Sequence, residues 1–213
     1  MEPNDKSWLR TPLTESNDII RHYDEWVSTY NRELVGWGYV APGLAAHRLV
    51  KVVPPWSAAL VLDVGCGTGL TGLALRSEGF DNLVGMDISA LSLQEAERTG
   101  VYERTVEHDF NAAPLPFPAA AFSGALCVGV MSYAADPLSL ISEIARVVRP
   151  GGAFVFTHRT DLWDRGNLPE VLDRHLRDHP GSVATWSDPM PYMPGNPDFT
   201  DTILVRYVTV VVA

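Results

Sequence analysis

Apolar residues follow two spacings along most of this chain, and the two spacings alternate. Unbroken apolar runs of strand length, typical of strands buried on both faces, occupy residues 59–64, 82–87, 121–129 and 152–158. Apolar residues every three or four positions, typical of one helix face, occupy residues 69–79, 89–100 and 137–149. Strands that alternate with helices of this length predict a parallel sheet with helices on both faces.

Two further helices are predicted before this alternation and a different pattern after it. Residues 16–34 have helical spacing, and Pro42 suits the first turn of a second helix, which Pro54 and Pro55 end. A weaker strand is expected near residues 103–108. The tail predicts a helix over residues 168–178 and then a β-branched run, TILVRYVTVVV, which can pair antiparallel with a strand near residues 183–186.

The stretch VLDVGCGTGL (61–70) contains three glycines in five positions directly after a buried strand. Such a turn lets a ligand approach the backbone and meet the amides at the start of the next helix. Dinucleotide-binding enzymes use G-x-G-x-x-G, but here Leu70 holds the third position and Gly69 falls one residue early. Asp63 would repel a pyrophosphate and attract an ammonium or sulfonium group. The turn therefore predicts a cationic adenosine cofactor.

Four motifs follow one another in a recognisable order: DVGCGTG, GMD, HDFNAAPLPF and RVVRPGGAFVF. Over roughly residues 15–160, the chain resembles the class I S-adenosylmethionine-dependent methyltransferases. YDEWVSTYN, GYVAPG and THRTDLW resemble, more narrowly, the methyltransferase-like proteins of the Williams–Beuren syndrome region and their bacterial relatives.

The fold that we expect is α/β and Rossmann-like. It has a seven-stranded, mostly parallel sheet with an antiparallel C-terminal strand, and helices on both faces. Residues 1–56 are expected to form an N-terminal helical lid segment and residues 57–213 the methyltransferase domain, together one structural domain.

The resemblance implies roles for three acids in binding S-adenosylmethionine. Asp63 faces the ammonium group, directly or through water, and Asp87 accepts hydrogen bonds from both ribose hydroxyls. An acid at the second position also binds a ribose diol in dinucleotide folds. Asp109 reads the amino edge of the adenine, with the backbone of Phe110. The other implied contacts are Gly65, Cys66, Gly67, Thr68 and Gly69 near the methionine and ribose, Ile88 on the adenine face, and Val128 to Met131 along the methionine.

Aromatic residues on the first helix have two interpretations. Tyr23, Trp26 and Tyr30 share one helical face, which suits either core packing or a lid whose rings meet a sulfonium cation. Tyr23 and Tyr30 are therefore also candidate cofactor contacts.

The catalytic candidates stand after the fourth and fifth strands. Many small-molecule relatives carry a histidine after the fourth strand, where MSYAADP offers Tyr133. His158 is the best base by its ordinary pKa, and Arg159, Tyr23 and Tyr30 complete the set.

The composition of the chain limits the kinds of partner that it is expected to bind. The chain has 213 residues, with 16 Lys plus Arg against 26 Asp plus Glu, a net charge of −10 that argues against a nucleic-acid partner. The two cysteines suggest reduced packing residues, the N-terminus does not resemble a secretory signal, and the longest apolar stretch is too short to span a membrane. We expect a cytoplasmic protein without membrane attachment. No metal is expected, because the histidines lack metal-ligand spacing.

The function that follows is methyl transfer from S-adenosylmethionine to a small molecule by in-line displacement. One alternative is a non-catalytic protein that binds S-adenosylmethionine or S-adenosylhomocysteine and acts through a partner. Another is a nucleotide-dependent oxidoreductase of related fold, which Asp63 and Leu70 disfavour. The sequence favours no particular acceptor atom or oligomeric state.

Overall fold

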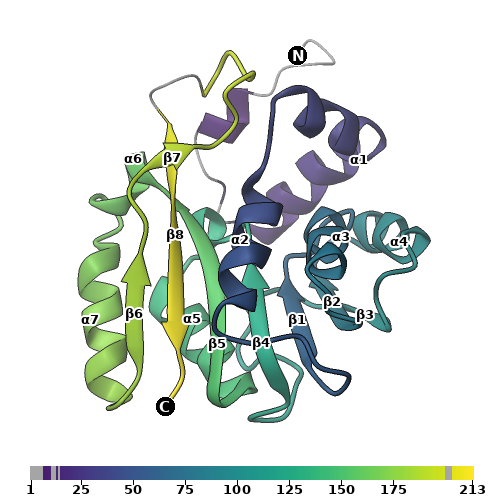
Figure 1. Ribbon diagram of the computed structural model, residues 1–213. Helices are drawn as coiled ribbons and strands as arrows, with labels where there is room; N and C mark the ends of the chain where they lie inside the picture. Colours follow the sequence, from purple (N-terminus) through teal and green to yellow (C-terminus); the bar gives the residue numbers. More distant parts are fainter. Residues whose placement is uncertain (1–6, 11–12, 14, 200–202) are drawn as a thin grey trace.

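The computed structural model describes residues 7–10, 13, 15–199 and 203–213 (Figure 1). Its helices are η1 (Ser7–Arg10), α1 (Ser16–Gly36), α2 (Ala41–Val50), α3 (Leu70–Ser77), α4 (Ala90–Arg98), η2 (Met131–Tyr133), α5 (Pro137–Val147), α6 (Thr160–Trp163) and α7 (Leu168–Asp178). Its strands are β1 (Leu60–Val64), β2 (Asn82–Asp87), β3 (Arg104–Glu107), β4 (Phe122–Cys127), β5 (Val148–Arg159), β6 (Val183–Trp186), β7 (Met190–Pro191) and β8 (Leu204–Val211).

The strands form one sheet in the order β3-β2-β1-β4-β5-β8-β6, and β7 pairs with β8. Strands β1 to β5 are parallel, and β8 runs antiparallel to both β5 and β6. The predicted α/β fold is therefore confirmed, as is the pairing of the C-terminal run with residues 183–186. The sheet has eight strands instead of seven, because the two-residue β7 adds to one end of β8.

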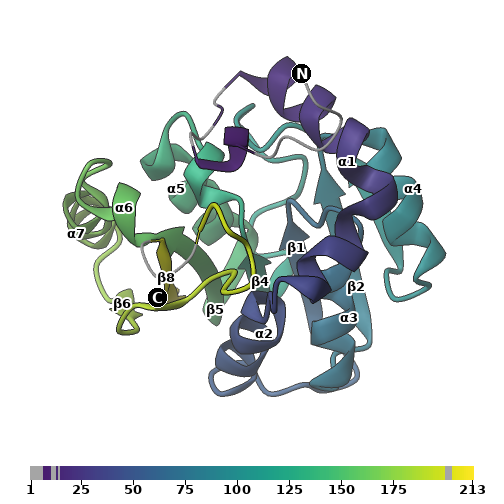
Figure 2. The ribbon, with the colours of Figure 1, turned by 90° about the horizontal axis from the view of Figure 1, so that it is seen from above.

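Alternate residues of the strands enter two separate cores. On β1, Leu62 packs on the side of α5 and α7, whereas Val61 packs on the side of α2 and α3. Phe154 and Val155 divide in the same way on β5. Figure 2 shows α5 and α2 on opposite sides of the sheet. Burial on both faces explains why the strand sequences are unbroken apolar runs.

The two helices of residues 1–56 have different positions. Figure 1 shows α1 at the upper end of the sheet, where β1 and β2 finish. In contrast, α2 packs on the sheet face through Ala45 and Leu49, which are both fully buried. Of these two α-helices, α1 is therefore the one that covers the edge at which parallel sheets of this kind bind ligands.

Four elements have no counterpart in the sequence-based expectations: η1, η2, α6 and β7. Each has four residues or fewer, which is too short to show a helical or strand period. Within the part of the chain that the structure describes, no helix has the length and hydropathy needed to cross a membrane.

Two stacked histidines lie at the end of α7, and His175, the buried one, faces α5. The ring of His175 is fully buried, stacks on His179 at 4.3 Å between centroids, and has Ser142 Oγ 3.5 Å from its Nδ1. Burial lowers the pKa of His175 to about 4, and His179 adds to the effect. The folded protein therefore takes up a proton here at lower pH than the unfolded chain does.

We predict that replacing His175 makes folding less sensitive to acid. A group whose folded pKa lies below its unfolded value stabilises the fold above the unfolded pKa, and that stability is lost as the pH falls towards the folded value. The free energy of unfolding of His175→Leu should therefore decline less than that of the native protein between pH 6.5 and 4, by up to about 1.4 kcal/mol per pH unit. Denaturant titration measures both, with His47→Leu, at an exposed position on α2, as the control. Parallel pH slopes for all three proteins would contradict this assignment.

Candidate functional site

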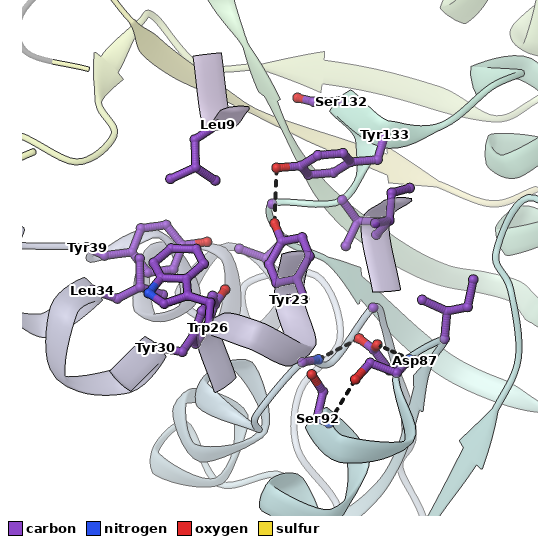
Figure 3. A pocket seen from close by; sticks show the side chains of 18 of the residues that line it. Leu9, Tyr23, Trp26, Tyr30, Leu34, Tyr39, Asp87, Ser92, Ser132 and Tyr133 are labelled. Carbon is purple, nitrogen blue, oxygen red and sulfur yellow. Dashed lines mark hydrogen bonds between the residues drawn. The ribbon is translucent and has the colours of Figure 1, made fainter. Parts of the chain in front are cut away.

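One pocket opens at the carboxyl ends of the parallel strands (Figure 3). Segments after β1, β2, β3 and β4, with the last residue of β5, form its floor, and α1 with residues 192–199 covers it. It contains about 840 Å³ of space, including the part open to solvent, which falls within the range of small-molecule sites. Its residues therefore come from both ends of the chain and from the middle.

The glycine turn forms one wall of this pocket. Gly65, Gly67 and Gly69 have φ values of +67°, +52° and +95°, a region that side chains disfavour. A Cβ on Gly65 would also lie 2.2 Å from Val130 Cγ2. Gly65 and Gly67 line the pocket, so the absence of side chains leaves their backbone open to a ligand.

The carboxylate of Asp87 is fixed beside this turn. Its Oδ2 accepts a hydrogen bond from the Gly67 amide at 2.8 Å, and its Oδ1 accepts one from the Ser89 amide at 2.9 Å. Burial raises the pKa of Asp87, although these amides act in the opposite direction. Asp87 lines the pocket, where it can accept hydrogen bonds from ligand hydroxyls.

Asp63 lies behind the turn and does not line the pocket. It is fully buried on β1, and its Oδ2 accepts a hydrogen bond from the Tyr102 hydroxyl at 2.6 Å. Its Oδ1 has no partner among the described residues. Burial raises the pKa of Asp63 to about 7, with the Tyr102 bond lowering it and Asp87 raising it. A buried acid with one unused oxygen is suited to a cationic partner.

Three side-chain hydrogen bonds attach α1 to the loops after β1, β2 and β3. Thr68 Oγ1 donates to Asn31 Oδ1, Ser89 Oγ donates to Asp24 Oδ1, and Ser16 Oγ donates to Asp109 Oδ2, each at 2.5 Å. Thr68 and Asp109 were predicted as cofactor contacts, but neither lines the pocket. In this structure both hold α1 in place.

The remaining predicted cofactor contacts divide into two groups. Ile88, Phe110 and Val128 line the pocket, whereas Cys66, Gly69 and Met131 do not. Cys66 is buried and burial raises the pKa of its thiol, which is the state expected for a packing residue.

Tyrosines line the end of the pocket away from Asp87. The Tyr23 hydroxyl donates to the Tyr133 hydroxyl at 3.0 Å, as Figure 3 shows. Tyr39 and Tyr192 form a second hydrogen-bonded pair, with ring centroids 5.5 Å apart. Tyr30 lies between the two ends. Burial raises the pKa of all these phenols, so they are neutral at pH 7.

Arg159 connects the two covering segments. Its guanidinium pairs with Asp161 at 2.7 Å, donates to the carbonyls of Leu9 at 2.5 Å and Arg10 at 3.0 Å, and lies over the ring of Phe199. Arg159 lines the pocket as well. It therefore anchors the N-terminal segment and the C-terminal loop above the site.

His158, the predicted base, does not line the pocket. Its ring is buried, with Nδ1 3.0 Å from the carbonyl oxygen of Arg159 and Trp163 at its edge. Burial lowers its pKa. His158 is absent from the pocket wall because side chains alternate along β5, so that Arg159 and His158 point to opposite sides of the sheet.

Comparisons with known proteins agree with this site. A family model described as a methyltransferase domain matches residues 62–156. Human methyltransferase-like protein 27 is 38% identical over 159 residues, which is 73% of this chain and 64% of the human protein. These matches support a resemblance of the chain to the class I S-adenosylmethionine-dependent methyltransferases.

Two further matches widen the comparison. A tRNA U34 carboxymethyltransferase of Geobacter sp. (strain M21) is 32% identical over 112 residues, 51% of this chain and 35% of that protein. The crystal structure of the [4+2]-cyclase SpnF superposes with a TM-score of 0.69 at 18% identity, over 95% of this chain and 99% of that one, which shows the fold alone. The chain spans between 35% and 64% of the length of these curated relatives.

The residues of this site fit S-adenosylmethionine, the cofactor of the methyltransferases that the chain resembles. The turn would exclude a side chain where a ligand approaches the backbone, Asp87 offers a carboxylate to hydroxyls, and Asp63 Oδ1 is an unused acceptor for an ammonium group. Ile88 and Phe110 offer apolar surface to a planar base.

Sequence reasoning missed Tyr102, Tyr39 and Tyr192, and with them Leu9, Met193 and Phe199 on the pocket wall. Of these residues, only Tyr102 could have been suspected from the sequence, through the two glycines that make space for its ring. Gly72 and Gly85 lie inside a helix and a strand, and neither has positive φ. Glycine in such positions often marks the close approach of another group.

We predict that Gly65→Ala destabilises the protein and abolishes cofactor binding. Gly100 is the matched control, because its φ is +66° and nothing lies within 4 Å of a Cβ built there. Both variants should lose about 1–2 kcal/mol through the left-handed backbone. Gly65→Ala should lose about 1–3 kcal/mol more through the contact with Val130. Thermal unfolding and calorimetric titration with S-adenosylhomocysteine measure both effects, and equal losses in the two variants would contradict the proposed contact.

We also predict that Arg159→Met loosens the N-terminal segment. The variant loses the hydrogen bonds to the carbonyls of Leu9 and Arg10, so trypsin should cut after Arg10 several-fold faster. Arg206→Met is the control, because Arg206 bonds Ser187 and stacks on Trp163 instead. Mass spectrometry of the fragments gives the rate, and equal cleavage in both variants would show that Arg159 does not anchor the segment.

Proposed function

We propose that this protein transfers the methyl group of S-adenosylmethionine to a small molecule held among the pocket tyrosines. One observation supports the proposal above all. A single pocket contains the glycine turn and Asp87 at one end and Tyr133, Tyr192 and Arg159 at the other. Cofactor and acceptor could therefore meet in one space covered by α1 and residues 192–199.

The cofactor, when bound, supplies a methyl group on a positively charged sulfur that is a good leaving group. The chain must then bind, align and exclude water. Tyr23, Trp26 and Tyr30 place aromatic rings on the pocket wall, and such rings attract a cation. Asp87 would hold the ribose, and Asp63 the ammonium group.

Tyr133 is the candidate that best fits a role in orienting the acceptor. Its hydroxyl accepts a bond from Tyr23 and can donate its own proton. Burial raises its pKa, although Tyr23 and Arg159 act to lower it, so Tyr133 is a hydrogen-bond donor at neutral pH. This favours an acceptor that enters with its nucleophilic atom already free of a proton, or that loses it to water.

The covered pocket favours a small molecule over a polynucleotide. Tyr192, Met193 and Phe199 are buried in the loop that closes the acceptor end. The net charge of −10 also opposes binding to a phosphate backbone. We therefore do not extend the tRNA named for the Geobacter relative to this chain.

A second candidate is a protein that binds the cofactor without transferring its methyl group. Among the described pocket residues, the phenols are protonated and Arg159 is paired with Asp161, so these groups do not provide a free base at pH 7. The likeness to a cyclase also shows that this fold serves other activities. Tight binding of S-adenosylhomocysteine without turnover on any metabolite pool would favour this candidate.

We predict that Asp87→Ala weakens cofactor binding by about tenfold to a hundredfold, because a charged acceptor is lost. Calorimetric titration with S-adenosylmethionine and S-adenosylhomocysteine measures the dissociation constant. Asp81→Ala is the control, since Asp81 is an exposed carboxylate that pairs with Arg76 and does not line the pocket. A folded native protein that binds neither compound would overturn the proposal. Binding by the native protein then justifies a screen for acceptors by isotopic methyl transfer.

Tyr133→Phe and His158→Gln separate the two catalytic candidates. With an acceptor in hand, we expect Tyr133→Phe to lower kcat about tenfold while leaving the dissociation constant for S-adenosylhomocysteine unchanged. His158→Gln should retain near-native turnover, because His158 does not line the pocket. The reverse pattern would transfer the catalytic role to His158.

A further inference from the structure

Tyr102 lies behind the glycine turn and does not line the pocket. Its hydroxyl donates to Asp63 Oδ2 at 2.6 Å and accepts a hydrogen bond from the Gly72 amide at 3.1 Å. Asp63 is paired in register with Gly85 on β2 and with Leu126 on β4, so its carboxylate is at the centre of the sheet. One carboxylate oxygen is thus occupied by Tyr102, and the other has no partner among the described residues.

Two glycines create the space for the Tyr102 ring. A Cβ on Gly72 would lie 2.4 Å from Tyr102 Cζ, and a Cβ on Gly85 would lie 3.2 Å from the ring. Neither glycine has positive φ, so backbone conformation does not require them. The helix α3 and the strand β2 both lack a side chain where Tyr102 enters. The sequence is therefore adapted to bring this hydroxyl to Asp63.

The neighbours of Asp63 make its ionised form costly without a cation. Burial and the charge of Asp87 both raise its pKa, and the Tyr102 hydrogen bond lowers it. The thiols of Cys66, after β1, and Cys127, on β4, also face this charge, and burial raises the pKa of both so that they stay neutral. Among these four neighbours, only Tyr102 favours the ionised carboxylate.

We propose that Tyr102 is a positioning residue: it holds Asp63 so that the second carboxylate oxygen receives the ammonium group of S-adenosylmethionine, and cofactor binding releases a proton from Asp63. This rests on the role proposed above for Asp63. The ammonium group enters with its own proton, and the carboxyl proton leaves to the solvent. The carboxylate of Asp63 therefore becomes negatively charged only when the ammonium group of the cofactor binds beside it.

The test is calorimetric titration with S-adenosylhomocysteine, which carries the same ammonium group. Titrations at pH 6, 7 and 8 in phosphate and in imidazole, which both buffer across this range and differ in ionisation enthalpy, give both the affinity and the number of protons released. With the pKa of Asp63 at about 7, the native protein should release about nine-tenths of a proton at pH 6, about half at pH 7 and about a tenth at pH 8.

Tyr102→Phe should bind at least about fivefold more weakly at pH 7 and recover affinity as the pH rises, because the ionised fraction of Asp63 at pH 7 falls from about one half to about one eleventh. The pH at which half of the proton is released should move up by about one unit, because the ionised carboxylate has lost its donor. A loss of packing alone would not move this midpoint. Gly72→Ala should reproduce the shift, since its methyl group would displace the hydroxyl and leave the tyrosine in the chain.

Tyr207→Phe is the matched control, because the Tyr207 hydroxyl is buried on β8 and has no partner among the described residues. It should match the native protein at each pH. An unchanged midpoint in folded Tyr102→Phe and Gly72→Ala would overturn the proposal for Tyr102. Asp63→Asn tests the role of Asp63 separately from the role of Tyr102. This variant should bind S-adenosylhomocysteine weakly and release no proton. If Asp63→Asn binds as the native protein does, the role of Asp63 itself is wrong, and if the native protein does not bind, the proposed function fails.

Discussion

The chain leaves β1 through a turn that adopts positive φ three times in five residues, and the site is arranged around that constraint. Because Gly65 has no side chain, Val130 from the segment after β4 can approach it closely. Because Gly67 points its amide at Asp87, the end of β2 is bound to the same turn. Three strand ends are thereby brought into one wall, and a side chain at either glycine would push them apart.

The first helix depends on the same wall for its position. Asn31, Asp24 and Ser16 bond to the loops after β1, β2 and β3, so α1 lies across the three strand ends. Its aromatic face then has two environments at once. Trp26 is almost fully buried in one of the two large cores, yet it also lines the pocket. Core packing and a covering role, which look like alternatives in the sequence, are both performed by one helical face.

Local patterns predicted the parts of the molecule that depend on neighbouring residues. The strands were visible as apolar runs because they are buried on both faces, and Gly65 and Asp87 were visible because they adjoin two of those runs. Tyr102 was not visible, because its partner Asp63 is 39 residues away and the only trace is two glycines whose purpose is space. Tyr39 and Tyr192 meet only after the whole chain has folded.

The same long-range pairing explains why Thr68 and Asp109 bond to α1 in this structure. The glycine motif shows which residues adjoin the cofactor loop. It does not show that α1 packs on this loop through Asn31, which is 37 residues from Thr68. His158 is a related case. Its position at the end of β5 was correct, and the direction of its side chain followed from a one-residue alternation.

Arg159 also bears on the order in which the protein folds. It joins the carbonyl of Leu9, 150 residues earlier, to the ring of Phe199 near the other end of the chain. Contacts of such separation form late, because a long loop must close before they contribute. During synthesis, therefore, η1 acquires this anchor only after Arg159 and Phe199 have both been made. Until then the carbonyls of Leu9 and Arg10 lack this partner, so η1 reaches its place above the site later than α1, whose bonds to the loops after β1, β2 and β3 need no residue beyond Asp109.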